Sequence, residues 1–176
     1  MTPGTGPQAT ATSRAWVATA LMVALFAMLF IPSLLLIDVF HDSTRVFQNI
    51  TYALVALIAF AVTVVVLIPV GAHTLGRYID ARTREGSDLR AALIFAGVAA
   101  GIGSVMAVPF TLSGSVGVLP LLTYMLVPGL AAFGTRMLLP VALRVKAVRA
   151  VAIVAAVAVG VVLATMAVWN VVQNIA

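Results

Sequence analysis

Long runs of apolar residues, separated by short polar segments, dominate this sequence. A helix that crosses a membrane needs about 20 predominantly apolar residues, and five runs reach that length. Because apolar residues follow one another within these runs and do not alternate with polar ones, the pattern favours helices over β-barrel strands. We therefore predict an all-α fold, a polytopic transmembrane helical bundle of about five spans. The predicted spans are residues 15–37, 50–72, 91–110, 116–135 and 150–172.

The first two runs carry no charged residue. At about 1.5 Å per residue, span 15–37 reaches about 34 Å, which is enough for a hydrocarbon core of about 30 Å. Trp16 lies at one end of this span, where an amphipathic ring prefers the headgroup region. Pro32 and Pro69 fall near the far ends of their spans and are expected to bend the helix there.

The fourth run is the least regular. Pro128 lies at its centre and predicts a kink, and Arg136 follows the run directly. A further apolar piece then occupies residues 137–143. Two arrangements fit this pattern. Either one long helix carries Arg136 with its long stem reaching water, or residues 137–143 lie along the membrane interface.

The five spans are expected to form a single membrane-embedded domain over residues 15–172. Residues 1–14 are small and polar with several Pro and Gly, which predicts a disordered cytoplasmic tail. Residues 173–176 would form a short outer tail. Polar loops are expected at 38–49 and 73–90, between the first three spans.

Composition supports a lipid environment. Apolar residues make up 63% of the 176 residues and charged ones 9%, whereas soluble domains average about 45–50% and about 25%. A water-soluble fold of this length has too much surface to hide so many apolar side chains. There is no cysteine, which excludes disulfides, thiol catalysis and cysteine-ligated metals.

The charge pattern predicts the orientation. Eight of the ten Lys and Arg residues flank one side of the five-span arrangement, in the N-terminal tail, the 73–90 loop and a basic turn at 144–149. Arg45 alone lies on the other side, and Arg136 borders the first. The positive-inside rule then places the N-terminus in the cytoplasm and the C-terminus outside. Because the net charge of +5 comes from these flanking positions, we expect no nucleic-acid partner.

The predicted location is the cell membrane, with the lipid bilayer as the immediate surroundings of the chain. Nine of the ten basic residues are arginines, and Ala and Val are abundant, which is typical of proteins from bacteria with GC-rich genomes.

Small residues recur every four positions in the third and fifth spans, a spacing that lets helix backbones approach closely. The third span has the pair Gly97 and Gly101 beside a ridge of Ala96, Ala100 and Ser104. The fifth span has the series Ala152, Ala156, Gly160 and Ala164. These faces predict packing within the bundle, or association with a second copy or with other membrane subunits.

Candidate chemistry is sparse. Asp38, His41 and Asp42 would share one face if the first helix continued outward, and such groups can bind a divalent cation. The segment is short, however, and a solvated helix end is the interpretation we adopt. Asp80 and Arg84 are spaced to pair on a helix. The basic 73–90 segment is read as a topological signal that could also touch anionic headgroups.

No Asp, Glu, Lys or His lies in the middle of any span, and proton-coupled transport and acid–base catalysis usually depend on such groups. We therefore expect no catalytic, cofactor-binding or metal-binding residue, no cofactor and no enzymatic activity. The leading hypothesis is a non-enzymatic scaffold or accessory subunit of a membrane complex. The alternative is a small transporter or substrate-binding membrane component, with its cavity formed at Pro32, Pro69, Pro109, Pro128 and the glycines of the third span.

Overall fold

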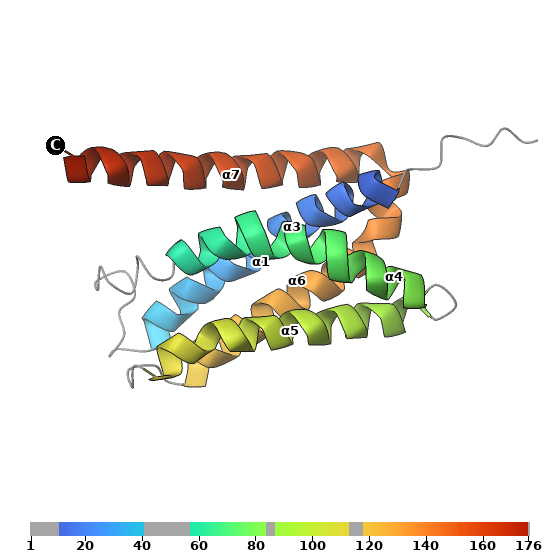
Figure 1. Cartoon of the computed structure of the whole chain (residues 1–176), viewed down its shortest axis with the longest axis horizontal. Helices are drawn as coiled ribbons and strands as arrows, with labels where there is room; N and C mark the ends of the chain where they lie inside the picture. The colour runs from blue at the N-terminus through green and yellow to red at the C-terminus, as the bar shows by residue number, and fades with distance from the viewer. Residues whose placement is uncertain (1–10, 41–56, 84–86, 113–117, 176) are drawn as a thin grey trace, which may run out of the picture.

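The computed structural model describes residues 11–40, 57–83, 87–112 and 118–175, and every regular element in these ranges is a helix (Figure 1). Four elements are long α-helices: α1 (Ala11–Phe40), α5 (Asp88–Leu112), α6 (Val118–Arg144) and α7 (Lys146–Ile175).

Between α1 and α5 the chain forms one continuous helical segment, residues 57–83, which we call helix 57–83. Its hydrogen-bonding pattern changes along its length. An α-helical start at 57–62 is followed by η1 (Thr63–Leu67), α3 (Ile68–Gly71), η2 (Ala72–Gly76) and α4 (Arg77–Thr83), of which η1 and η2 are π-helical.

The predicted number of apolar helices is confirmed. Five helices are long and apolar enough to cross a membrane, and each coincides with one of the runs in the sequence. Their apolar stretches are Ser13–Ser33, Leu57–Ile79, Asp88–Val105, Leu122–Arg144 and Lys146–Met166.

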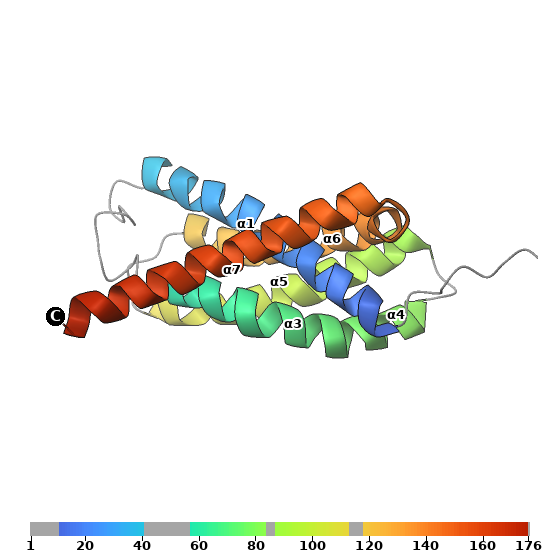
Figure 2. The ribbon, with the colours of Figure 1, turned by 90° about the horizontal axis from the view of Figure 1, so that it is seen from above.

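The helices form a group of four with a fifth on the outside (Figures 1 and 2). Within the group, α5 packs most extensively on α6, and α1 packs on α6 and on helix 57–83. The outer helix, α7, lies against α1 and the end of α6. Because α1 packs on α6, α7 and helix 57–83, it is the centre of the bundle, and half of its apolar stretch is buried.

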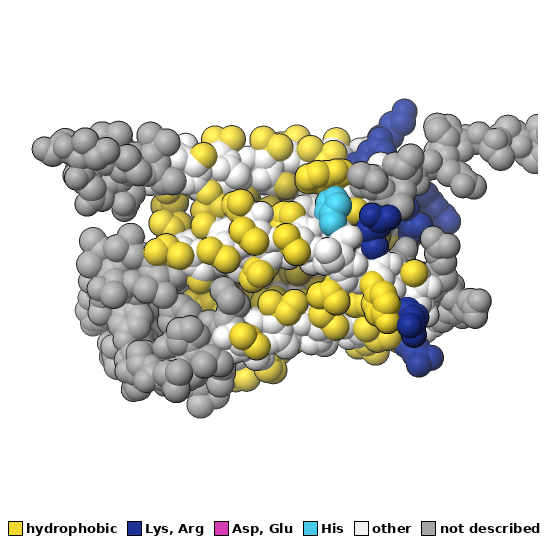
Figure 3. Space-filling view, viewed as in Figure 1, with side chains coloured by type: hydrophobic (Ala, Val, Ile, Leu, Met, Phe, Trp, Pro, Cys, Tyr) yellow, Lys and Arg dark blue, Asp and Glu magenta, His cyan; other side chains and the backbone are white. Residues whose placement is uncertain are grey.

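Basic residues gather at one end of the bundle, which we call the basic end (Figure 3). The start of α1, the whole of α4, the start of α5, the end of α6 and the start of α7 all meet there (Figure 1). Its described Lys and Arg residues are Arg14, Arg77, Arg82, Arg90, Arg136, Arg144, Lys146 and Arg149. Apolar side chains cover the visible surface away from that end (Figure 3).

The helices extend beyond the predicted spans at both chain termini. α1 begins at Ala11, so residues 11–14 are helical and do not belong to the predicted disordered tail. At the other end, α7 continues to Ile175, so residues 173–175 are helical too and do not form a separate outer tail. An apolar run marks the part of a helix that suits lipid, whereas extension of an existing helix costs little per residue, so polar flanks continue it.

The predicted loop at 73–90 is mostly helical, because helix 57–83 continues to Thr83 and α5 begins at Asp88. Two of the polar side chains on which the loop prediction was based contact carbonyl groups of the helix backbone. His73 Nδ1 lies 2.9 Å from the Pro69 carbonyl oxygen, and the Thr74 hydroxyl donates to the Val70 carbonyl at 2.6 Å. In this π-helical stretch, side chains thus contact carbonyls four residues back, which keeps polar residues compatible with the helix.

The basic turn predicted at 144–149 reduces to one non-helical residue. α6 ends at Arg144 and α7 begins at Lys146, with Val145 between them. The Val145 N–H donates to the Val141 carbonyl at 2.7 Å, and the Val145 carbonyl accepts from Arg149 at 3.2 Å. The chain therefore reverses direction with its backbone hydrogen bonds preserved. Of the two arrangements considered for residues 116–143, the single long helix is found, and it contains both Pro128 and Pro140.

Close packing of α5 on α6 depends on small residues, but not on the predicted glycine pair. A Cβ atom added to Gly97 or Gly101 would meet nothing within 4 Å. A Cβ added to Gly103 would instead overlap the Tyr124 carbonyl oxygen and lie 2.9 Å from Cγ of Pro128. The contact thus runs along the neighbouring ridge, where Ala100 approaches a glycine of α6, Gly129.

The fifth helix uses only half of its predicted ridge. Ala152 is buried and Ala156 is half-buried against α1, as the four-residue spacing predicts. Gly160 is exposed, and a Cβ there would meet nothing within 4 Å. The contact instead continues through Val159 and Leu163, because a straight α-helix returns to the same face after 3.6 residues, not four.

A candidate binding cavity among four helices

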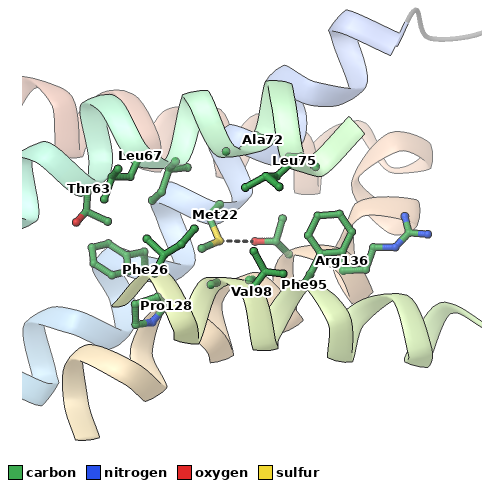
Figure 4. A pocket seen from close by; sticks show the side chains of 18 of the residues that line it. Met22, Phe26, Thr63, Leu67, Ala72, Leu75, Phe95, Val98, Pro128 and Arg136 are labelled. Atoms are coloured by element: carbon green, nitrogen blue, oxygen red, sulfur yellow. Dashed lines mark hydrogen bonds between the residues drawn. The ribbon is translucent and has the colours of Figure 1, made fainter. Parts of the chain in front are cut away.

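A cavity of about 520 Å³ lies among α1, helix 57–83, α5 and α6 (Figure 4). Ligand pockets in proteins commonly measure about 300–1,000 Å³. Each of the four helices contributes at least five lining residues, whereas α7 contributes none within the described part of the chain. The cavity is therefore a property of the four-helix group, and it runs along the helices toward the basic end.

Irregular backbone in helix 57–83 shapes one wall. Pro69 has no N–H to donate, and its ring would clash with the carbonyl four residues earlier in a regular α-helix. The chain avoids this clash by widening: the Ile68 N–H bonds to the Thr63 carbonyl, five residues back, in η1. Gly71 and Gly76 follow and present no side chain to the cavity that they line. A wider turn followed by two glycines leaves space that a regular leucine-rich helix would fill.

Aromatic rings line the end of the cavity away from the basic end. Phe26, Phe30 and Phe60 are mutually stacked, with ring centroids 5.2–5.6 Å apart. Tyr124 meets Phe30 edge to face at 5.9 Å. All four residues line the cavity, and Phe26, Phe30 and Phe60 are almost fully buried. This end therefore offers flat, rigid, apolar surface.

Two threonine hydroxyl groups line the cavity, that of Thr63 near the aromatic rings and that of Thr135 in the middle, and both hydrogens are already donated (Figure 4). Thr63 donates to the Ala59 carbonyl at 2.7 Å and Thr135 to the Ala131 carbonyl at 2.7 Å. The Thr135 hydroxyl also lies 3.6 Å from the Met22 sulfur, which is the contact drawn in Figure 4. The remaining side chains there are apolar (Met22, Leu67, Ala72, Leu75, Phe95, Val98, Ala99 and Ile102).

Three arginines line the cavity at the basic end: Arg14 of α1, Arg77 of α4 and Arg136 of α6. The stem of Arg136 lies beside Phe95, and its guanidinium points away from the apolar residues (Figure 4). It forms an ion pair with Asp88, the first residue of α5, at 3.4 Å. The Arg136 side chain is 11% exposed and that of Asp88 69%, so the pair lies where the bundle meets water.

The cavity is partly open, and helix packing locates the opening. Helix 57–83 contacts α5 mainly through α4, near the basic end. A Cβ on Gly76 would lie 3.7 Å from the Phe95 ring, so the two helices are also close at that level. Further along, η2 and α3 pack on α1, and neither η1 nor α3 has an extensive contact with α5. The side of the bundle between α3 and α5, which faces the viewer in Figures 1 and 3, is therefore where the cavity opens.

The candidate residues from the sequence fall into three groups. Arg136 lines the cavity and extends to the bundle end, as one of the two proposed arrangements required. Asp38 lies in the last turn of α1, whereas His41 and Asp42 lie outside the described residues, so the metal hypothesis is not tested. The described residues contain no cluster of three or more possible metal ligands. The proposed partner of Asp80, Arg84, also lies outside them.

The sequence hypothesis of a cavity formed by prolines and third-span glycines was partly informative. Pro128 and Gly103 line the cavity, and Pro69 shapes its wall from one position away. Pro32 is exposed on α1 and does not line it. The missed signal is the sequence Pro69, Gly71 and Gly76, because a proline followed by glycines at two and seven positions is unusual in an apolar helix that packs by side chains.

Comparison with known proteins adds no assignment. No family model, curated protein or solved structure matches the chain.

Proposed function

We propose that the protein is a multi-pass membrane component that binds an apolar or amphipathic small molecule inside the bilayer. The single observation that carries this proposal is the cavity of about 520 Å³ among four apolar helices. A bundle that served only as a scaffold would gain packing by filling such a space, because unfilled volume forfeits contacts between its walls. A bundle that binds another molecule in this space has a reason to keep the space open.

The chemistry of the lining supports an apolar ligand. The hydroxyl hydrogens of Thr63 and Thr135 are both donated to backbone carbonyls. A sugar or nucleotide would lose its hydrogen bonds to water on entering and find few partners there, at a cost of roughly 1–3 kcal/mol for each unsatisfied group. An aliphatic or aromatic ligand has no such cost and gains contact with the Phe26, Phe30 and Phe60 rings.

Binding without chemical conversion is the form of this proposal. Among the described lining residues, the ionisable side chains are arginines and one tyrosine, groups that ordinarily keep their protons near neutral pH. General acid–base catalysis works best when the pKa of the catalytic group lies near the operating pH. We therefore propose a carrier, a receptor or the substrate-binding part of a transport system, and not an enzyme.

The proposed location is the cell membrane, with the basic end in the cytoplasm. Outward-facing large apolar side chains along α7, such as Val151, Val154, Val157 and Val161, would be unfavourable in water and suit lipid. The collection of Arg and Lys residues at one end supports the orientation, because such residues are retained on the cytoplasmic side during insertion.

Photoaffinity labelling tests the proposal. The probe is hexadecanol carrying a diazirine in its chain, applied to the protein in zwitterionic lipid nanodiscs and mapped by mass spectrometry. We expect labels on cavity residues such as Met22 and Val98. Gly71→Phe should abolish them, because Gly71 lines the cavity and an added side chain there meets nothing within 4 Å.

Gly97→Phe is the matched control for that experiment. It adds the same ring to a helical glycine with open space, but Gly97 does not line the cavity. Labelling should therefore persist. Labels scattered over the outer surfaces of the bundle, and equal in both variants, would show that the cavity binds no apolar ligand.

A second candidate function is association with another membrane protein through α7, and one observation favours it. Gly160 lies on the small-residue ridge of α7, yet it is exposed and has no neighbour within reach of a Cβ. Small residues on an outer helix surface allow close approach of a further helix. The accessory-subunit hypothesis thus remains a proposal, tested by copurification in mild detergent with wild-type protein and Gly160→Leu: a stable larger complex lost in the variant supports it.

A further inference from the structure

We infer that the ligand of this cavity is a single-chain amphiphile with an anionic headgroup. Its carboxylate or phosphate would lie at Arg14, Arg77 and Arg136, and its chain would extend toward Phe26 and Phe30. This inference rests on the proposed binding function and specifies the class of molecule bound.

The charge of the lining is one-sided. Three arginines line the cavity at the basic end, and no Asp or Glu is among its described lining residues. The carboxylate of Asp88 pairs with Arg136 from an exposed position outside the lining. The charged groups that the described part of the lining presents are guanidinium groups. These bind carboxylates and phosphates through paired hydrogen bonds, so an anionic group is the complementary partner.

The polarity of the cavity changes along its length, as the polarity of an amphiphile changes from its head to its chain. Arginines line one end, donor-poor aliphatic surface follows, and stacked rings line the other end. A fully apolar ligand would place no complementary group at the arginine end, and a small anion would leave the apolar section unfilled. A molecule with a charged head and an aliphatic chain is complementary to both sections at once.

The dimensions favour one chain. Along α1 the lining extends from Arg14 to Phe30, which corresponds to about 24 Å at about 1.5 Å per residue. This length exceeds that of one leaflet of the hydrocarbon core, which is about 15 Å thick, half of the full core. A cavity that is long, narrow and about 520 Å³ in volume suits a single extended chain, such as a fatty acid, an alkyl phosphate or a lysophospholipid, better than the paired chains of a diacyl lipid.

The side opening provides a route from the bilayer. It lies between α3 and α5. Arg14 and Arg77 lie within two residues of the ends of their apolar stretches, and Arg136, eight residues inside its own stretch, reaches the exposed Asp88 at the basic end. In a bilayer this level corresponds to the headgroup region. An anionic lipid could therefore move sideways into the cavity without taking its charge into the hydrocarbon core, which would be strongly unfavourable.

The test compares two diazirine probes with the same sixteen-carbon chain, the fatty acid and the alcohol, in zwitterionic nanodiscs at a pH that ionises the acid. We expect the acid to reach half-maximal labelling of the cavity at about tenfold lower concentration than the alcohol, which corresponds to about 1.4 kcal/mol, because guanidinium groups attract a carboxylate more strongly than a neutral hydroxyl. The Arg14→Gln/Arg77→Gln double variant should remove this preference, so that acid and alcohol reach half-maximal labelling at the same concentration.

Arg144→Gln/Arg149→Gln is the matched control. It removes the same charge from the same end of the bundle, but neither residue lines the cavity. The preference for the acid should persist in it. If both double variants lose the preference equally, the arginines act only through the general surface charge, and the assigned headgroup site is wrong. An unchanged thermal unfolding midpoint in detergent serves as the check that each variant remains folded.

Two further outcomes would overturn the inference and are distinguishable from failure of the binding function. Equal labelling of the cavity by acid and alcohol in wild-type protein would reject the anionic headgroup while binding stands. Displacement of the acid by inorganic phosphate, but not by sodium chloride at equal ionic strength, would assign the arginines to a free anion. Absence of cavity labelling by either probe would instead reject the binding function itself.

Discussion

Glycines in this chain have opposite structural roles that their spacing does not reveal. Gly97 and Gly101 match a familiar helix-packing pattern, yet both have open space around them. Gly103 is not four residues away from either of them, and at Gly103 α5 lies against the α6 backbone. Sequence pattern alone identifies a helix suited to close packing, but the face used depends on where the partner helix lies. That information comes from residues far away in the chain.

The contrast between two of these glycines gives a sharp prediction. Gly103→Ala should lower the free energy of unfolding by about 1–3 kcal/mol, because the added methyl overlaps the Tyr124 carbonyl. Gly101→Ala, two residues earlier in α5, should be neutral or stabilising by up to about 1 kcal/mol, because alanine favours a helix and nothing lies near its Cβ. Thermal unfolding of both variants in detergent decides the matter. Equal midpoints would mean that α5 and α6 do not meet at Gly103.

Helix 57–83 contains both an apolar run and an interior proline, and these two features predict different backbone geometries. An apolar run predicts a regular helix, and a proline predicts a kink, but the chain responds by π-helical widening on both sides of α3. π-Helical segments are rare and are often found at functional sites. The sequence could locate Pro69 but could not predict how the backbone accommodates it, because bending and widening cost similar energies and neighbouring helices decide between them.

Pro69→Ala should therefore weaken binding even though it stabilises the helix. Restoring the N–H allows η1 to return to α-helical bonding, which would rotate every residue beyond it by about 100° around the helix axis, one residue of a 3.6-residue turn. Gly71 and Ala72 would then leave the cavity wall. We expect the free energy of unfolding to rise by up to about 3 kcal/mol and hexadecanol-probe labelling of the cavity to fall by about tenfold. Unchanged labelling would show that the π-helical turns are incidental to the cavity.

The outer helix, α7, gives a third prediction from two positions on one ridge. Ala152→Leu should destabilise the protein by about 1–3 kcal/mol, since Ala152 is 4% exposed and packs between α1 and α6. Gly160→Leu should leave thermal stability unchanged in the monomeric protein, because its surroundings are open. Unfolding midpoints together with light scattering separate the two effects. A loss of stability for Gly160→Leu in a monodisperse monomer would contradict the observed position of α7.

At the scale of the whole molecule, the number and order of the apolar helices followed directly from the sequence, because lipid selects for long apolar runs. Their limits did not, since the helices at 73–83 and at Lys146–Arg149 continue through charged residues that usually indicate a loop. The cavity was foreseen only as an alternative, through Pro128 and the third-span glycines. The three arginines of the cavity come from three different helices, and they lie at the same end only in the assembled bundle.

The orientation of the whole bundle can be measured because the chain contains no cysteine. A single Ser87→Cys substitution places a thiol on an exposed residue at the basic end, just before α5. In intact cells this thiol should resist a membrane-impermeant maleimide and react after permeabilisation, since basic flanks remain in the cytoplasm. A reporter fused after Ala176 should show an external location. Reaction of the introduced thiol in intact cells would reverse the proposed orientation.

The pairing of helices also dictates an order of assembly during synthesis. α5 and α6 are consecutive and tightly fitted, so they can associate as soon as both have left the ribosome. α1 is made first, but its most extensive contacts are with α6 and α7, the last helices to be made. If the chain inserts into a bilayer as proposed, α1 would therefore stay surrounded by lipid chains until the second half of the chain arrives. The interior space would come into being at that late step, with lipid already in the place where its walls meet.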